Sequence, residues 1–510
     1  MFSFCLLPYA VWNFIDSILG LCFYNKYKRK LIEIASRINV NDNPIVAVVI
    51  PIYNDFLFDS ARITFSQTYQ NTKYYILDDS TDEKIKHEID LFANKYNVVV
   101  IRGHNKIVNG QKYNCGLAAA FSNFINKTID EWEFMVHVDS GDILNPQHVE
   151  KNLPFFYANP KLGVLTPCSC GILNKSMFQN LCSSFEEIVS VPGFFQTQYY
   201  SRIMPGAGTT YRKNALKELG YWPDFLSEDG AVSLSLVKLG WETMFSNIVL
   251  SQQLDPFDFH TYVYRMFRWE KGFYEMRKSN FYNTAKYKTL DLISKINLFI
   301  SGTSGVLRIP YVWITLFIYP VFCFFSNSTV NIFLYIPFSI TIIFPILISL
   351  VSFFISWKQQ GFKKSLHFLM FALLFPMLLA GCFLVITKCW ITSFIMKTKP
   401  KFIVTKKINN NNNKILKKIL PYLIGSIFIV LFSIIAYYFL FPDCLKTQES
   451  IYLYLFKVPS FFFFCIFPLL STLLAYIILE IYSKYAWHKK EFNNYGDFSS
   501  SLCLKKEGKI

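Results

Sequence analysis

Three short apolar runs in the first third of the chain each end in acidic residues. These motifs are PIYND after Val46–Ile50, with Tyr53 and Asp55; LDDS at the end of Tyr74–Leu77, with Asp78 and Asp79; and DSGD after Met135–Val138, with Asp139 and Asp142. Like charges gathered at one edge are costly unless a cation or hydrogen-bond donors compensate them. A divalent ion bridging carboxylates and a diphosphate is the usual solution. Each motif alone is typical of a turn, but three at successive strand ends favour a binding site.

Another acidic pair lies further along the chain, in Ser227-Glu228-Asp229. These residues open the helical pattern Gly230–Leu239, which places both carboxylates near a helix N-terminus. Ser and Asp are also good helix caps, so a purely structural role stays open for this motif.

A basic and aromatic segment follows at Tyr264–Gly272, with the sequence YRMFRWEKG. Helical spacing puts Arg265, Arg268 and Trp269 on one face. Two guanidinium groups suit a diphosphate, and an indole suits the face of a sugar ring. A solvated basic helix next to a membrane is the structural alternative.

Strands and helices alternate between residues 30 and 290, where no segment is a candidate membrane span. Strands are also predicted at Val98–Ile101 and Gly163–Thr166, and helices at Gln111–Phe124 and Pro146–Tyr157. This alternation indicates a mostly parallel sheet covered on both faces. Such sheets bind ligands at the carboxyl ends of their strands, where the acidic motifs lie.

The composition is that of a membrane protein. Hydrophobic residues make up 52% of the chain and charged residues only 17%, too much apolar surface for one soluble core. The formal net charge of +16 could indicate nucleic acid, but the lysines cluster beside apolar runs. That arrangement is typical of the positive-inside rule, so we expect membrane lipid and no nucleic acid as a partner.

Five segments are long and apolar enough to span a bilayer: Phe4–Tyr24, Ile309–Phe325, Ile332–Trp357, Ile419–Phe441 and Val458–Tyr482. Leu366–Ile395 is also apolar, but lysines flank it on both sides. We expect it to be interfacial or re-entrant, with Pro376 and Gly381 as bend points; a true span is the alternative. Lysines after the first span place the following domain in the cytosol.

Together the motifs resemble the processive family 2 glycosyltransferases, the group that contains cellulose, hyaluronan and mannan synthases. The resemblance covers about Val46 to Gly272. PIYND is similar to the opening nucleotide-binding strand, LDDS to the uracil-binding acidic pair, DSGD to the metal-binding DxD motif, SED to the TED motif with the catalytic base, and RMFRW to QxxRW. Gly110-Gln111-Lys112 resembles the GxK segment near the diphosphate, Gly208–Arg212 a stretch near the acceptor, and Phe402–Thr405 the FxVT gating loop.

This chain departs from the family pattern at three positions. Gly141 occupies the second acidic position of DxD, with Asp142 one place later, so metal ligation by Asp142 is left open. TED is replaced by SED, which keeps both acids, and QxxRW by RxxRW, which puts Arg265 in place of the amide.

The resemblance implies a role for each motif residue. Asp229, Glu228 and Asp139 would be catalytic, with Asp229 as general base, and Mg²⁺ or Mn²⁺ would bind at Asp139 and Asp142. Substrate would contact the remaining motif residues: Tyr53, Asp55, Asp78, Asp79, Lys112, Arg265, Arg268, Trp269, Phe402 and Thr405.

The fold class implied is α/β, with a GT-A-type, Rossmann-like cytosolic domain between an N-terminal transmembrane helix and a C-terminal helical transmembrane bundle. The expected divisions are an anchor (1–29), the GT-A domain (30–290), transmembrane or interfacial helices (291–396), a Lys/Asn-rich cytosolic loop (397–418), two transmembrane helices (419–483) and a cytosolic tail (484–510).

The function implied is inverting, processive transfer of hexose units from a nucleotide sugar, a UDP-hexose, to a growing polysaccharide. Export of the polymer would be coupled to synthesis, in a multi-pass protein of the plasma membrane. Two alternatives stay open: a non-processive enzyme that adds one sugar to a lipid carrier or diacylglycerol, and a transporter without catalysis. Product analysis separates the first alternative, and hydrolysis of the donor sugar separates the second.

Overall fold

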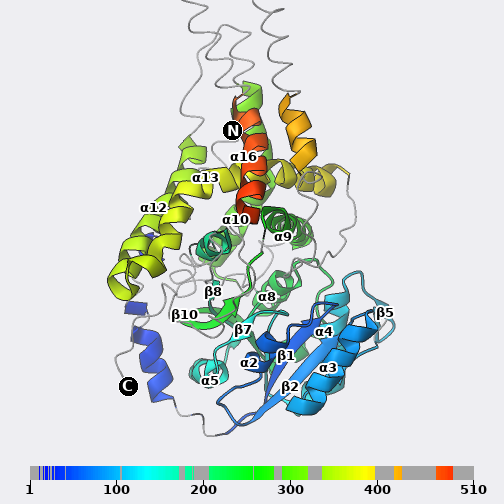
Figure 1. Ribbon diagram of the computed structural model, residues 1–510. Coiled ribbons are helices and arrows are strands. Elements are labelled where there is room, and N and C mark those ends of the chain that lie inside the picture. The colour runs from blue at the N-terminus through cyan, green and yellow to red at the C-terminus, as the bar shows by residue number, and fades with distance from the viewer. Residues whose placement is uncertain are drawn as a thin grey trace, which may run out of the picture.

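The computed structural model describes most of the α/β part of the chain and several of the helices that follow (Figure 1). The described ranges are 42–103, 106–171, 178–185, 206–256, 258–280, 290–319, 336–396, 419–427 and 467–485, together with separate positions between 11 and 40 and residue 188. Most of the expected anchor at 1–29, the loop at 397–418 with Phe402 and Thr405, and nearly all of the tail lie outside these residues.

One mixed sheet forms the centre of the α/β domain, in the strand order β3-β2-β1-β6-β9-β8-β10-β7. Its strands are β1 Val46–Ile52, β2 Thr72–Asp78, β3 Val99–Ile101, β6 Phe134–His137, β7 Ile143–Leu144, β8 Leu162–Gly171, β9 Thr209–Arg212 and β10 Glu242–Gln253. β3, β2, β1 and β6 are parallel, whereas β9 runs antiparallel to both β6 and β8. All five strands predicted from the sequence are present, and the acidic motifs therefore follow parallel neighbours.

Helices pack on this sheet because their buried faces are apolar. They are α2 Phe58–Thr64, α3 Glu83–Tyr96, α4 Gly116–Thr128, α5 His148–Ala158, α7 Lys213–Leu219 and α8 Glu228–Lys238, with a 3₁₀ turn at Ile129–Glu131. Phe121 on α4 stacks on Trp222, their ring centroids 4.4 Å apart, and Phe124 stacks on Trp132 at 5.7 Å. Both tryptophans are almost wholly buried, so α4 is fixed firmly against the sheet.

The predicted helix Gln111–Phe124 is wrong at its start. Ile107–Val108 (β4) and Gln111–Lys112 (β5) form a two-stranded hairpin, and α4 begins only at Gly116. Asn109 and Gly110 join the two strands, with φ of 49° and 78°. An Asn-Gly pair with positive φ at both positions is the preferred two-residue hairpin turn, and this signal outweighs helical periodicity here.

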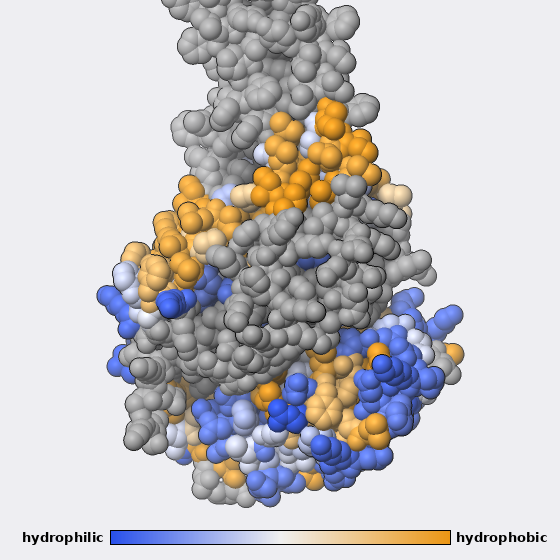
Figure 2. All heavy atoms as spheres, viewed as in Figure 1, coloured by the Kyte–Doolittle hydropathy of each residue, from blue (hydrophilic) through white to orange (hydrophobic). Residues whose placement is uncertain are grey.

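Long helices follow the α/β domain: α9 Phe259–Asn280, α10 Leu292–Trp313, α12 Ile336–Gln360, α13 Phe362–Trp390 and α16 Phe467–Tyr485, with π-helical turns at Ile314–Ile318 and Ile391–Ile395. In Figure 1 they lie together on one side of the sheet, with α9 between the α/β domain and the other helices. Figure 2 shows hydrophobic atoms gathered over these helices and hydrophilic atoms over the α/β domain.

The segments expected to span the membrane are helical wherever the structure describes them. Among the described residues one helix, Ser365–Ile395, is long and apolar enough to cross a bilayer by length and composition, and an 18-residue stretch of it has a mean hydropathy of 2.7. This is the segment that we expected to be interfacial. The helix runs through both predicted bend points, Pro376 and Gly381. Gly381 instead makes room for Phe259 of α9, because a Cβ there would lie 2.7 Å from that ring.

Candidate active site at the carboxyl ends of the strands

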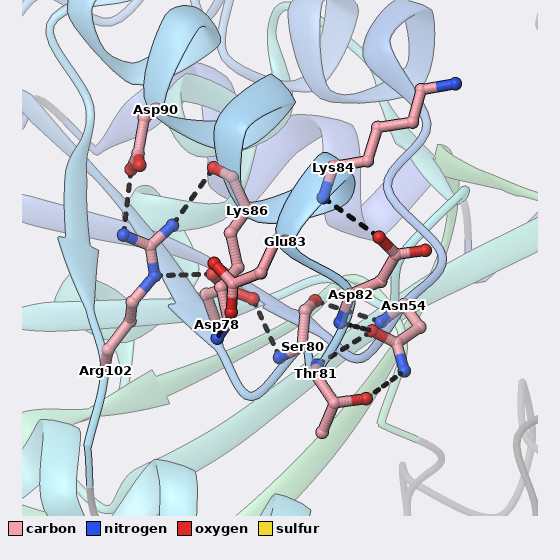
Figure 3. A network of polar contacts seen from close by, with 10 residues as sticks. All are labelled: Asn54, Asp78, Ser80, Thr81, Asp82, Glu83, Lys84, Lys86, Asp90 and Arg102. Atoms are coloured by element: carbon pink, nitrogen blue, oxygen red, sulfur yellow. Dashed lines mark hydrogen bonds and ion pairs between the residues drawn. The ribbon is translucent and has the colours of Figure 1, made fainter.

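Asp78, the last residue of β2, is held by hydrogen bonds within the protein. Its side chain is fully buried; Oδ1 accepts from the Ser80 amide at 2.9 Å, and Oδ2 accepts from Arg102 Nε at 2.6 Å. Arg102, directly after β3, also pairs with Asp90 on α3 at 2.9 Å. Figure 3 shows this guanidinium between the two carboxylates. A buried charge needs such partners, so Asp78 is fixed in place.

Asn54, within PIYND, ties the end of β1 to the loop after β2. Its backbone has a φ of 55°, and its side-chain oxygen accepts from the amides of Thr81 and Asp82 at 2.9 and 3.0 Å (Figure 3). Its own amide donates to Ser80 Oγ at 3.0 Å. Asn tolerates this left-handed conformation better than most residues, which explains its place at the turn. The LDDS loop is therefore rigidly attached to PIYND.

Beside this junction lie Tyr53 and Asp55, both predicted to contact substrate. Asp55 Oδ1 accepts from the Tyr53 amide at 3.2 Å, and the Asp55 carbonyl accepts from Ser140 Oγ at 2.8 Å. Tyr53 is 45% exposed, so it is accessible to a ligand at this edge. The bond to Ser140 links the PIYND and DSGD motifs directly.

The second acid of LDDS, Asp79, lies against the start of α4. A Cβ on Gly116, the first residue of α4, would lie 3.4 Å from Asp79 Oδ2 and 3.7 Å from Lys106 Cε. The loop before α4 is anchored by Asp224, which accepts from the amides of Asn114 and Cys115 at 2.8 Å. Lys112 is exposed on the β4–β5 hairpin that leads into this loop.

Asp139 and Asp142, the acids of DSGD, lie in different surroundings. Asp139 Oδ1 is 3.1 Å from Nε2 of the buried His137, and 48% of the Asp139 side chain is exposed. Asp142 is only 5% exposed, and its Oδ1 accepts from the Leu254 amide at 3.3 Å. Gly141 has a φ of 84°, which turns the chain between them. The Asp139 carboxylate is thus about half exposed at the strand ends, whereas Asp142 packs inward on the end of β10.

Glu228 and Asp229 form the first turn of α8. Asp229 Oδ2 accepts from the Gly206 amide at 2.8 Å, and Oδ1 accepts from the Gly230 amide at 2.7 Å. A Cβ on Gly206 would lie 2.8 Å from that of Asp229, so only glycine fits there. The N-terminus of α8 and these two amides orient the Asp229 carboxylate.

Burial raises the pKa of both carboxyls at the start of α8. For Glu228 it raises the pKa well above the usual range, and the charges of Asp229 and Asp139 add to this, opposed by Arg268. For Asp229 burial also raises the pKa, with a further contribution from Asp139, while the Gly230 and Gly206 amides lower it. These carboxylates are therefore close enough to interact, and a base of raised pKa suits proton transfer near neutral pH.

The RMFRW motif lies on α9, which packs against the start of α8. A Cβ on Gly272 would lie 2.6 Å from that of Ser227, so the two helices touch at this point. Arg265 stacks on Trp269, with Cζ 4.3 Å from the ring centroid. Arg268 and Trp269 are both partly exposed. This contact confirms that Arg265 and Trp269 share a face, which is part of the face predicted for Arg265, Arg268 and Trp269.

Sequence reasoning missed the residues that hold the acidic side chains. His137 and Arg102 could have been found, because each lies at or directly after a strand end, where the acids themselves were sought. Gly206, whose amide donates to Asp229, and Asp224, which anchors the loop before α4, had no local signal, because their partners are distant in sequence.

Within the described residues, no group of three or more His, Cys, Asp or Glu side chains converges as a metal site. Mg²⁺ characteristically uses one or two carboxylates together with substrate phosphates. The exposed carboxylate of Asp139 fits that kind of shared site, and the inward-facing Asp142 fits it poorly.

Residues 134–479 match the family described as glycosyl transferase family group 2, and this match covers more than half of the 510 residues. The chain belongs to this family. It is a glycosyltransferase with an α/β domain, which confirms the predicted resemblance and the prediction of an enzyme over a transporter without catalysis.

Among named relatives, this glycosyltransferase is similar to poly-beta-1,6-N-acetyl-D-glucosamine synthase of Staphylococcus epidermidis, with 24% identity over 68% of this chain and 81% of the relative. It is also similar to probable glucomannan 4-beta-mannosyltransferase 14 of Arabidopsis thaliana, with 23% identity over 54% of this chain and 53% of the relative.

A solved structure, mannosyl-3-phosphoglycerate synthase from Rubrobacter xylanophilus, shares 13% identity over 42% of this chain and 68% of its own, with a TM-score of 0.28. That score is too low for the comparison to add to the description of the fold.

Proposed function

We propose that this glycosyltransferase is an inverting, processive polysaccharide synthase of the plasma membrane. Its donor is a nucleotide sugar, a UDP-hexose, and its acceptor is the growing polymer, which is exported as it is made. Support comes from two relatives named for polysaccharide-forming activities. The observation that carries the proposal is the contact between α9, with Arg268 and Trp269, and the start of α8, with Glu228 and Asp229.

The proposed base is Asp229, because the Gly206 and Gly230 amides orient its carboxylate and burial raises its pKa. It accepts the proton of the acceptor hydroxyl as that oxygen attacks the anomeric carbon. The bond from the anomeric carbon to the nucleoside diphosphate breaks as the new glycosidic bond forms. One displacement from the opposite face inverts the anomeric centre.

The departing diphosphate carries negative charge, so cations must lie near it. Arg268 is the proposed protein cation on α9, and Lys112 on the β4–β5 hairpin is a second. Mg²⁺ or Mn²⁺ held by Asp139 would neutralise further charge on the diphosphate. Tyr53, Asp55 and Asp79 are proposed to contact the nucleoside, since they lie at the ends of β1 and β2. Asp78, expected from the resemblance to contact substrate, is instead fully buried and paired with Arg102, so it supports this loop from inside the protein.

Trp269 is proposed to stack on the acceptor sugar at the entrance to a translocation path. A polar polymer cannot cross lipid unaided, because its hydroxyls would lose water without gaining partners. α9 connects the two halves: His260 Nδ1 lies 2.8 Å from the Tyr476 hydroxyl on α16, and Phe259 packs at Gly381 of α13. The acceptor site is thereby joined to the apolar helices.

The test is synthesis by the purified full chain in proteoliposomes with labelled UDP-hexoses, including N-acetylated ones. The expected product is a polymer that specific glycosidases digest. If the polymer is exported as it is made, it collects on the side of the vesicle membrane opposite the active site, where it is protected from glycosidase added on the active-site side. A single sugar added to lipid would instead identify the non-processive enzyme. Trp269→Ala is expected to reduce polymer more than nucleotide release; equal polymer length and amount would contradict the acceptor role.

A further inference from the structure

Arg265 is engaged by two groups at the end of β10. Its Nη1 lies 3.1 Å from Asp255 Oδ1, and its Nη2 donates to Gln253 Oε1 at 3.3 Å. The side chains of Arg265 and Asp255 are only 9% and 1% exposed. A fork of two donors on two acceptors fixes the plane of the guanidinium, not merely its position.

Asp255 is itself fixed by its surroundings. A Cβ on Gly171, the last residue of β8, would lie 2.4 Å from Asp255 Oδ2, so the carboxylate occupies space that only glycine leaves. The Asp255 carbonyl accepts from Gln179 Nε2 at 2.9 Å. Because β8 and β10 pair up to Gly171 and Gln253, the carboxylate is anchored to the sheet.

The anchored guanidinium lies over the indole of Trp269, one helical turn further along α9. Its Cζ is 4.3 Å from the ring centroid, within the range of a cation–π contact. One face of the indole is thus covered by Arg265, and a sugar would stack on the other. A continuous set of contacts leads from the sheet through Asp255 and Arg265 to the ring.

We propose that Arg265 is a positioning residue that fixes the indole plane of Trp269, and not a ligand of the donor diphosphate. This inference rests on the proposed function, in which Trp269 holds the acceptor. The proposal explains why Arg265 stands where the family motif QxxRW has glutamine. In this chain Asp255 supplies the buried carboxylate with which an arginine pairs. A glutamine could not compensate that buried charge.

The experiment uses the full chain in proteoliposomes and two substitutions designed to keep the fold. Arg265→Lys retains a charge for Asp255 but lacks the flat, forked group. The double variant Arg265→Gln/Asp255→Asn removes both charges together and leaves an amide pair. Two quantities are measured for each: the donor KM from nucleotide release, and the sugar incorporated into polymer per nucleotide released.

In both variants the donor KM is expected to stay within about twofold of the original value. The incorporation ratio should fall by about twofold to thirtyfold, the range for loss of a cation–π contact. An unchanged incorporation ratio, or a donor KM raised about tenfold or more, would overturn the proposal, the latter by making Arg265 a diphosphate ligand. Failure of both variants to fold would also overturn it, since Arg265 would then serve the fold alone.

Arg308→Gln is the matched control. It removes the ion pair of Arg308 with Glu270, the neighbour of Trp269 on α9, without touching the indole. Its incorporation ratio should match the original chain. Trp269→Ala separates the two proposals: if it leaves the ratio unchanged, the acceptor role itself is wrong. If it lowers the ratio and the Arg265 variants do not, only the positioning role fails.

Discussion

On the β1–β2 side of the strand-end edge, the buried Asp78 is paired with Arg102, and Asn54 joins the neighbouring loops by hydrogen bonds. On the β6–α8 side, burial raises the pKa of Glu228 and of Asp229, and the nearby charge of Asp139 raises both further. The first arrangement is the low-energy one for buried carboxylates. The second is kept at a cost, which is typical of reactive sites.

The largest expected effect on the reactive β6–α8 side comes from a substitution at Asp229. Asp229→Asn keeps an oxygen that can accept from the Gly206 amide but removes the base, so transfer should fall by about a hundredfold to ten-thousandfold. Donor binding should stay nearly intact, and so should the melting temperature. Near-normal turnover of the variant in a nucleotide-release assay would show that Asp229 is only a helix cap.

A second comparison concerns the two acids of DSGD. Asp139→Asn should abolish the dependence of donor binding on divalent cations, because this carboxylate is exposed at the edge. Asp142→Asn should keep that dependence, since an amide oxygen can still accept from Leu254. Donor binding is measured while Mn²⁺ is varied. Equal loss in the two variants would show that Asp142 also ligates the metal.

On the β1–β2 side, substitutions of the paired residues should lower the stability of the protein more than its turnover. Arg102→Ala leaves the fully buried Asp78 carboxylate without its guanidinium. We expect a loss of about 2 kcal/mol in the free energy of unfolding, below the usual value for a buried pair because Arg102 is partly exposed. Thermal unfolding measures this, and Arg102→Ala/Asp78→Asn should recover most of it. A single variant as stable as the original would contradict the structural role.

The pH dependence of transfer should reflect the raised pKa of Asp229. A base must be deprotonated to accept a proton, so activity is lost as pH falls through its pKa. Burial raises that pKa, so the acid limb should have its midpoint above about 3.9, the ordinary value for Asp. A kcat profile with saturating donor tests this. A midpoint at or below the ordinary value would mean that another group limits the reaction.

The sequence predicts those features of the strand-end edge whose signal lies within a few residues. The positions of Asp78, Asp79 and Asp139 at strand ends are predicted, because an acid directly after an apolar run marks the end of a strand. The shared face of Arg265 and Trp269 was predicted because helical spacing is regular. The pairing of Arg265 with Asp255 was missed, since it depends on how the end of β10 meets α9.

Other contacts were beyond prediction because they join distant parts of the chain. Asp224 anchors Asn114 across 110 positions, and the amide of Gly206 reaches Asp229 across 23. Neither contact leaves a pattern in its own neighbourhood. The β4–β5 hairpin was missed for a different reason: its Asn-Gly turn was a readable signal that helical periodicity obscured.

The smallest expected effects come from substituting two glycines that each lie beside a carboxylate, one on the β6–α8 side of the edge and one on the β1–β2 side. A methyl on Gly206 would lie 2.8 Å from Asp229 Cβ, a distance that forces the carboxylate to move. A methyl on Gly116 would lie 3.4 Å from Asp79 Oδ2, an ordinary contact. Gly206→Ala should therefore lower kcat by about tenfold, because small displacements of a catalytic group are costly.

Gly116→Ala serves as the matched substitution, since it adds the same methyl group beside a carboxylate at the start of a helix. Alanine is favoured over glycine in helices by up to about 1 kcal/mol, so this variant should be slightly more stable and turn over normally. Both are compared by kcat and by thermal unfolding. If Gly206→Ala loses stability and activity in proportion, or if Gly116→Ala loses as much turnover, then Asp229 is no more sensitive to its position than Asp79. The contrast between a fixed and a reactive side of the edge would then have no functional meaning.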